Sequence, residues 1–160
     1  MPHAIATGQV GSIMPDLTLV DADGNAGALD DVRGGEVAVI YFMRASVCPV
    51  CLRHVRALSS LAESGQLGDA RVILIAPGGT DEARRLAGHV DSTRVSPWAS
   101  GSGHTDAGLG SFLLLQHSGT FVVEADGVVR YRRTSALPIR NFDRRELLQS
   151  LAQNPPINAR

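Results

Sequence analysis

The chain has 160 residues, a hydrophobic content of 44%, a charged content of 19% and a formal net charge of −1. This length predicts a single domain over residues 1–160, with a core of about 10–152 that needs no disulfide staples. A near-neutral charge without a basic run argues against nucleic acid or a membrane surface as a partner. No stretch has the pattern of a leader or a membrane helix, so we expect a cytoplasmic protein.

Hydrophobic runs separated by turn formers predict the element order β-β-α-β-α-β-β-α. Residues 13–33 have the pattern of a hairpin and turn, and 92–110 is a long polar loop that is either functional or mobile. The predicted strands are 17–20, 37–43, 71–76, 121–124 and 128–132, and the predicted helices are 49–63, 80–89 and 141–151. Strands 37–43 and 71–76, joined by a helix, are expected to be parallel. The fold class is therefore α/β.

Two residues are the predicted N-terminal caps of these helices. Thr80 or Asp81 is expected to cap the helix at 80–89, and Asn141 is expected to cap the last helix. Pro155 and Pro156 end that helix.

The only two cysteines, Cys48 and Cys51, form a C-P-V-C motif between the apolar run 37–43 and the helix that follows. A C-x-x-C pair at a strand-to-helix junction is typical of a redox site. Pro49 suits the first turn of a helix, where a missing N–H costs nothing. The helix dipole at Cys48 favours the thiolate, which attacks disulfides and peroxides.

The helix after the motif is amphipathic, and this predicts different environments for the two cysteines. Cys51, Val55, Leu58 and Ala62 share one face of the helix, which should pack on the core. We therefore expect Cys48 to be partly exposed and attacking, and Cys51 to be buried and resolving. The pair should form a reversible disulfide.

With these elements placed, the sequence resembles the thioredoxin-fold redoxins, in particular the alkyl hydroperoxide reductase/thiol-specific antioxidant (AhpC/TSA) family. The resemblance spans about residues 10 to 152. Four segments carry it in the family's order: 11–24, which is similar to its G-x-x-A-P-D-F-x-L and D-G pattern, 39–58 with C-P-x-C, 72–76, and 119–127, which is similar to its G/T-T-F hairpin.

This resemblance implies a thioredoxin-like fold, in which a central mixed β-sheet is flanked by helices and preceded by an N-terminal β-hairpin extension. It implies a thiol-dependent antioxidant that reduces peroxides, exchanges disulfides, or does both. No cofactor is implied, because the electrons travel as thiols. The implied partners are thioredoxin or a low-molecular-weight thiol as reductant, a peroxide or disulfide as substrate, and a second copy of the chain if it forms a homodimer.

Two departures from the family pattern bear on the choice of substrate. Conventional peroxiredoxins place Thr or Ser three residues before the attacking cysteine and Pro seven before, where this chain has Ala45 and Tyr41. They also place Arg just ahead of the G-T-F strand, where this chain has His117 and Ser118. Thioredoxins place a cis-proline there. These differences favour disulfide exchange over fast peroxide reduction.

Several residues near the motif allow both a chemical and a structural interpretation. The Arg44 guanidinium could stabilise a thiolate or an anionic substrate, or be a solvated loop charge. His54 is more typical of packing than of a base, Tyr41 of the core and Ser46 of a turn. Trp98 could pack the 92–110 loop or line a groove.

The alternative function is a metal-binding or redox-sensing module that uses the C-P-V-C cysteines without turnover. Zinc commonly takes four ligands from two close pairs, and this chain has one C-x-x-C. His54, His89, His104 and His117 are the residues that could complete such a site. No close second pair is present among them.

Overall fold

The computed structural model describes residues 8–101, 111–112, 115–116, 118–135 and 137–152. The strands of its main sheet are β1 (Thr18–Val20), β2 (Ala26–Ala28), β3 (Ala38–Phe42), β4 (Arg71–Ala76), β5 (Val95–Ala99), β8 (Ser118–Val123) and β9 (Val129–Ser135). Short strands β6 (Ser111–Phe112) and β7 (Leu115–Gln116) pair separately. The helices are α1 (Leu29–Arg33), α2 (Pro49–Glu63), α3 (Thr80–Ala87), the 3-10 helix η1 (Pro138–Arg140) and α5 (Arg144–Ala152).

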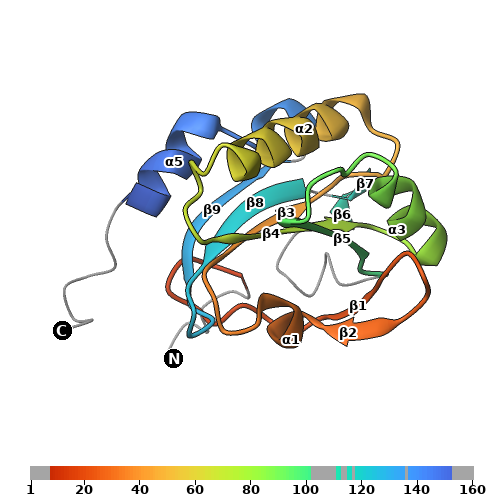
Figure 1. Cartoon of the computed structure of the whole chain (residues 1–160), viewed down its shortest axis with the longest axis horizontal. Coiled ribbons are helices and arrows are strands. Elements are labelled where there is room, and N and C mark those ends of the chain that lie inside the picture. The colour runs from red at the N-terminus through yellow and green to blue at the C-terminus, as the bar shows by residue number, and fades with distance from the viewer. Residues whose placement is uncertain (1–7, 102–110, 113–114, 117, 136, 153–160) are drawn as a thin grey trace.

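The main sheet has the strand order β2-β1-β5-β4-β3-β8-β9 (Figure 1). Strand β3 lies near its middle, parallel to β4 and antiparallel to β8, with five residue pairs on each side. All five residues of β3 are buried, which explains its continuous apolar sequence. Strand β5 continues the parallel part beside β4. Strands β1 and β2 form the antiparallel hairpin that the sequence predicts near the N-terminus.

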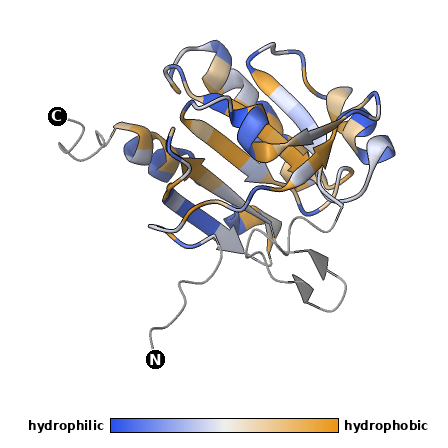
Figure 2. Ribbon diagram, turned by 90° about the horizontal axis from the view of Figure 1, so that it is seen from below, coloured by the Kyte–Doolittle hydropathy of each residue, from blue (hydrophilic) through white to orange (hydrophobic). Residues whose placement is uncertain are grey.

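The two faces of the sheet support two hydrophobic clusters, because successive side chains of a strand point to opposite faces. Tyr41 and Met43 contribute to the first cluster, which α2 and α5 cover, and the central strands are mostly orange in Figure 2. Ile40 and Phe42 contribute to the second cluster, which Leu29 of α1 joins from the opposite side of the sheet. The mixed sheet with helices on both faces confirms the predicted fold class.

The described part of the 92–110 segment, residues 92–101, differs from the prediction of a loop. Its residues Val95–Ala99 form strand β5, paired with β4 over five residues and with β1 only at Val20 and Ala99. The sequence did not predict this strand because Pro97 lies within it. Proline cannot donate to a sheet ladder and usually marks an edge strand or a loop. Trp98 packs against the second cluster and donates its indole N–H to Ser96 Oγ (2.6 Å). His104 lies outside the described residues.

The helix caps also differ from the prediction. Helix α5 begins at Arg144, and the Asp143 carboxylate accepts the Glu146 N–H (2.9 Å), so Asp143 rather than Asn141 caps it. Helix α3 has Gly79 at its N-cap, and the Glu82 carboxylate accepts the Gly79 N–H (2.8 Å). The side chain of Asn141 is buried instead, and its contacts belong to the site described below.

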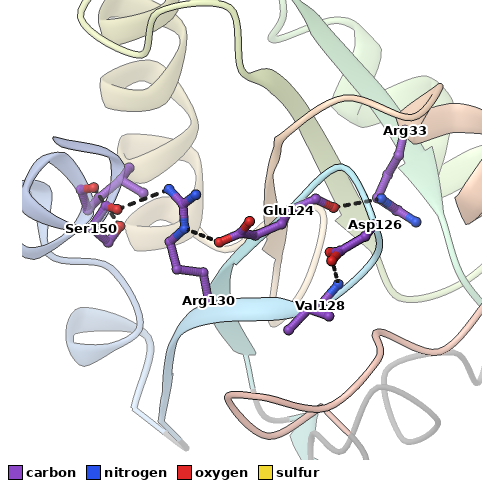
Figure 3. Close-up of polar contacts among 7 residues, drawn as sticks. Arg33, Glu124, Asp126, Val128, Arg130 and Ser150 are labelled. Carbon is purple, nitrogen blue, oxygen red and sulfur yellow. Dashed lines mark hydrogen bonds and ion pairs between the residues drawn. The ribbon is translucent and has the colours of Figure 1, made fainter. Parts of the chain in front are cut away.

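The turn between β8 and β9 is connected to helices on both faces of the sheet (Figure 3). Arg33 of α1 donates to the Glu124 carbonyl (3.2 Å). Arg130 of β9 donates to the Glu124 carboxylate (2.7 Å) and to the Ser150 carbonyl of α5 (3.4 Å). Among the described segments, no helix is long and apolar enough to cross a membrane.

Candidate active site

Cys48 is the N-cap residue of α2, and Pro49 is the first residue of the helix. The segment from Met43 to Val47 connects the end of β3 to this position. The Cys48 side chain is half-buried, and its Sγ accepts the backbone N–H of Cys51 (3.3 Å). A sulfur that accepts an N–H at the positive end of a helix dipole is placed to carry negative charge.

Cys51 is fully buried in the first hydrophobic cluster. Burial raises the pKa of its thiol to about 11, and a hydrogen bond with Cys48 adds to the increase. Hydrogen bonds from the Arg44 backbone and the Tyr41 side chain lower the pKa of Cys51 in part. Cys48 is therefore more exposed than Cys51, as the helix pattern predicts.

Arg44 lies in the segment between β3 and α2 and is half-buried. Its backbone contacts the Cys51 thiol, and among the described residues its guanidinium makes no ion pair. Ser46 is buried in the turn before Cys48, whose N–H donates to the Ala45 carbonyl (3.2 Å). The structure thus brings Cys48, Cys51 and the Arg44 main chain together.

A buried polar network that sequence reasoning missed lies beside Cys51. The Tyr41 hydroxyl is 3.0 Å from His54 Nδ1 and donates to Asn141 Oδ1 (3.1 Å). Asn141 Nδ2 donates to Ser118 Oγ, and the Thr120 hydroxyl donates to the Asn141 carbonyl (2.7 Å). Tyr41 and Cys51 also belong to the same buried cluster, and each affects the pKa of the other.

His54 connects this network to the partly exposed surface of α2. Its ring lies 5.0 Å from the Phe142 ring and 5.9 Å from the Tyr41 ring, centroid to centroid. Burial lowers the pKa of His54, against a smaller opposing effect of the Asn141 hydrogen bond. Because an ordinary histidine titrates near pH 6.5, this imidazole is mainly neutral at pH 7. The ring therefore packs against Phe142 and Tyr41, as the sequence indicated, and also lies within hydrogen-bond distance of the Tyr41 hydroxyl.

Two members of the network, Tyr41 and Ser118, are among the positions where the chain departs from the peroxiredoxin pattern, and Asn141 joins them directly. Arg133 does not replace the missing arginine. It lies across from Thr120 on β9, but its guanidinium is engaged by Glu146 and by the Arg140 carbonyl. The site therefore contains a hydroxyl–amide network at positions where the family places proline and arginine.

Within the described ranges, no three side chains among His, Cys, Asp and Glu gather into a group that could hold a metal ion. Of the histidines considered as ligands, His54 contacts Tyr41, and His89 lies beyond the end of α3. His104 and His117 fall outside the described residues.

The AhpC/TSA family model matches residues 10–132 of the chain. Among solved structures, peroxidoxin BcpB from Mycobacterium tuberculosis has a TM-score of 0.72 at 18% identity, over 91% of this chain and 97% of that one. A peroxiredoxin-like protein from Aquifex aeolicus has a TM-score of 0.76 at 15% identity, over 92% and 88%. Thiol peroxidase from Chromobacterium violaceum has a TM-score of 0.70 at 16% identity, over 93% and 90%. No curated protein matches significantly.

At these identities the solved structures show the fold alone, which is the peroxiredoxin type of thioredoxin-like fold. The family match covers well over half of the chain and includes β3, the C-P-V-C motif and the β8–β9 hairpin. It confirms the resemblance that the sequence motifs indicated. The chain therefore belongs to the AhpC/TSA family and is a peroxiredoxin-like, thiol-dependent oxidoreductase.

Proposed function

We propose that the chain uses Cys48 and Cys51 as a dithiol–disulfide pair, with Cys48 as the attacking residue. The observation that carries this proposal is the position of Cys48, half-buried at the N-cap of α2 with its sulfur accepting an N–H, beside a buried Cys51. At this position the helix dipole and the N–H favour the thiolate. Two cysteines that only packed in a hydrophobic core would need neither the helix dipole nor the N–H bond.

Two substrates lead to the same oxidised protein. With a disulfide, the Cys48 thiolate attacks one sulfur, the other sulfur leaves as a thiolate, and a mixed disulfide remains. With a peroxide, the thiolate attacks one oxygen and the O–O bond breaks, so Cys48 becomes a sulfenic acid and the other oxygen leaves as hydroxide or alkoxide and takes up a proton. Cys51 then attacks the Cys48 sulfur, releasing a thiolate or water and forming the Cys48–Cys51 bond. A thioredoxin-type or low-molecular-weight thiol returns two electrons, so no organic cofactor takes part.

Between the two substrates, the site supports disulfide exchange together with slow peroxide reduction. Ala45 offers no hydroxyl, and the Ser118 hydroxyl is bonded to Asn141 inside the network. A peroxide would therefore lack two expected hydrogen-bond donors, each of which can contribute roughly 3–4 kcal/mol to the transition state. Arg44, which lies in the segment before Cys48, is the residue that we propose takes over part of this role. A single close cysteine pair also suits the reducing environment of the cytoplasm.

The decisive experiment is stopped-flow oxidation of the reduced protein by hydrogen peroxide and, in parallel, by a model disulfide. We expect both to consume two thiols per chain, with a peroxide rate well below the diffusional ceiling. Cys48→Ser should abolish both reactions, and Cys51→Ser should stop each at the mixed disulfide or sulfenic acid. Purified metal-free protein whose thiols resist both oxidants would exclude the proposal, whereas bound zinc with protected cysteines would support the metal-binding alternative.

A further inference from the structure

We propose that Tyr41 and His54 form a proton relay that activates Cys51 for the resolving step. This inference rests on the proposed function, because it assigns the path by which the second cysteine loses its proton. The two relay residues come from different elements: Tyr41 from β3 and His54 from α2, one turn after Cys51 on the same helix. Residues three apart on a helix share a face, so one hydroxyl can reach both.

Cys51 needs such a path because of where it lies. It is fully buried, so water does not reach its sulfur directly. Burial disfavours its charged form, and its thiol keeps its proton at neutral pH. The resolving attack nevertheless requires a thiolate. A base must therefore take this proton from within the protein.

The Tyr41 hydroxyl is placed to transfer that proton. It has one proton to donate and two lone pairs to accept with. Its hydrogen-bond neighbours are His54 Nδ1 at 3.0 Å and Asn141 Oδ1 at 3.1 Å, and Cys51 lies in the same buried cluster. Asn141 is itself fixed by its bond to Ser118. Burial raises the pKa of Tyr41 far above its ordinary range, so the hydroxyl passes protons on without remaining ionised.

For the transfer, the Tyr41 O–H turns from Asn141 Oδ1 to His54 Nδ1, which then carries no proton of its own. The Cys51 thiol gives its proton to the Tyr41 oxygen while the Tyr41 proton moves to His54 Nδ1. The resulting Cys51 thiolate attacks the Cys48 sulfur, the bond from Cys48 to its leaving group breaks, and the leaving thiolate or hydroxide takes up a proton from solvent. The half-buried His54 then releases its extra proton to solvent. General-base assistance of this kind contributes on the order of a hundredfold or more to a rate.

The groups around the relay are few and can be named. Tyr41 and Cys48 face the Cys51 sulfur, together with the Arg44 backbone. Tyr41 and Asn141 face the His54 ring, and the Arg53 charge acts on it from the same helix. In the resolving step the Cys48 sulfur is already bonded to its leaving group, so His54 is the member of this set that titrates, and burial holds its pKa below the ordinary value. The resolving rate should therefore follow the deprotonation of His54.

Ellman's reagent separates the two chemical steps in one stopped-flow trace. The first thionitrobenzoate released reports attack by Cys48, and the second reports resolution by Cys51. Tyr41→Phe and His54→Gln should leave the first phase within about twofold and slow the second by roughly a hundredfold at pH 7. Tyr131→Phe and His89→Gln are matched controls outside the relay and should change neither phase. Cys51→Ser should release one thionitrobenzoate only.

The pH profile of the second phase distinguishes a relay from a loss of packing. In the wild type its midpoint should lie below about pH 6.5, the ordinary value for histidine. In Tyr41→Phe the midpoint should move toward the Cys51 pKa of about 11. The double variant should be no slower than Tyr41→Phe, because the two groups act in series.

Three outcomes would overturn the relay: an unchanged second phase in both variants, a wild-type midpoint retained in both, or equal slowing in the matched controls. If Tyr41→Phe fails to fold, His54→Gln decides alone. If the wild-type protein shows no first phase, the proposed function fails rather than the relay.

Discussion

Cys48 exposes part of its side chain at the start of α2, whereas Cys51 is buried one turn later with its thiol pKa raised to about 11. Each pKa unit changes the thiolate fraction tenfold. Limiting iodoacetamide near pH 6.5 should therefore label Cys48 at least about tenfold faster than Cys51, as measured by peptide mass spectrometry. The Cys48→Ser variant should react slowly. Faster labelling of Cys51 would reverse the proposed roles.

Arg44 is the residue whose charge we propose assists peroxide reduction. A hydrogen bond to a charged group contributes about 1.5–3 kcal/mol, which corresponds to roughly a 10- to 100-fold change in rate. Arg44→Ala should therefore slow peroxide turnover by this factor. It should affect disulfide exchange less, since the group that leaves a disulfide is a soft thiolate. The exposed Arg56, on the same helix as the cysteines, provides the control Arg56→Ala. Equal losses in both reactions would show that Arg44 acts on Cys48 rather than on the peroxide.

At the scale of single elements, the start of α5 can be tested through its cap. Asp143 accepts the Glu146 N–H, and losing such a cap costs typically about 1 kcal/mol. Asp143→Ala should lower the unfolding free energy by this amount in urea titration, while Asp143→Asn should keep most of it. Arg144→Ala, at the exposed neighbouring position, should have little effect. A loss from Asp143→Asn as large as that from Asp143→Ala would contradict the capping role.

Elements with a clear local pattern were predictable from the sequence. The helix at 49–63 and the strand at 71–76 have the predicted bounds, because an amphipathic repeat and an apolar run leave few alternatives. Strand β5 was not predictable, because Pro97 and Ser96 interrupt its apolar pattern and its pairing with β4 decides its structure. Tertiary pairing outweighs local preference in such strands.

Part of the candidate site was likewise predictable from the sequence, and part was not. The cysteine pair, its helix start and the unequal burial follow from the spacing C-P-V-C and the helix period. The network around Tyr41 does not, because Tyr41 and Asn141 are 100 residues apart in the chain. Each residue also has a common local interpretation: Tyr41 as a core aromatic residue and Asn141 as a helix cap. The packing of η1 against α2 brings this part of the chain next to β3.

At the scale of the whole molecule, the buried Cys51 thiol makes stability depend on pH. Its pKa is raised in the folded state, so the stabilising contribution is complete below the unfolded value and is lost as pH rises through about 11. The reduced wild type should thus lose on the order of 2–3 kcal/mol of unfolding free energy relative to Cys51→Ala over this alkaline range. Urea titrations from pH 8 to 11 measure this difference. A constant difference would show that Cys51 keeps an ordinary pKa in the folded protein.

The single residue pair between β1 and β5 has a consequence for local opening. Val20 and Ala99 are the one residue pair that joins the N-terminal hairpin to β5, and Arg84 of α3 donates to the Ala22 carbonyl in its turn (3.3 Å). Strand β3, in contrast, has five-pair ladders on both sides. Segments with few ladder bonds open at a lower free energy than the core. Amide protons of β1 and β2 should therefore exchange with solvent deuterium well before those of β3. We therefore expect the strand that leads into the redox motif to stay closed while the hairpin opens, so that fluctuations at one end of the sheet leave the geometry of Cys48 intact.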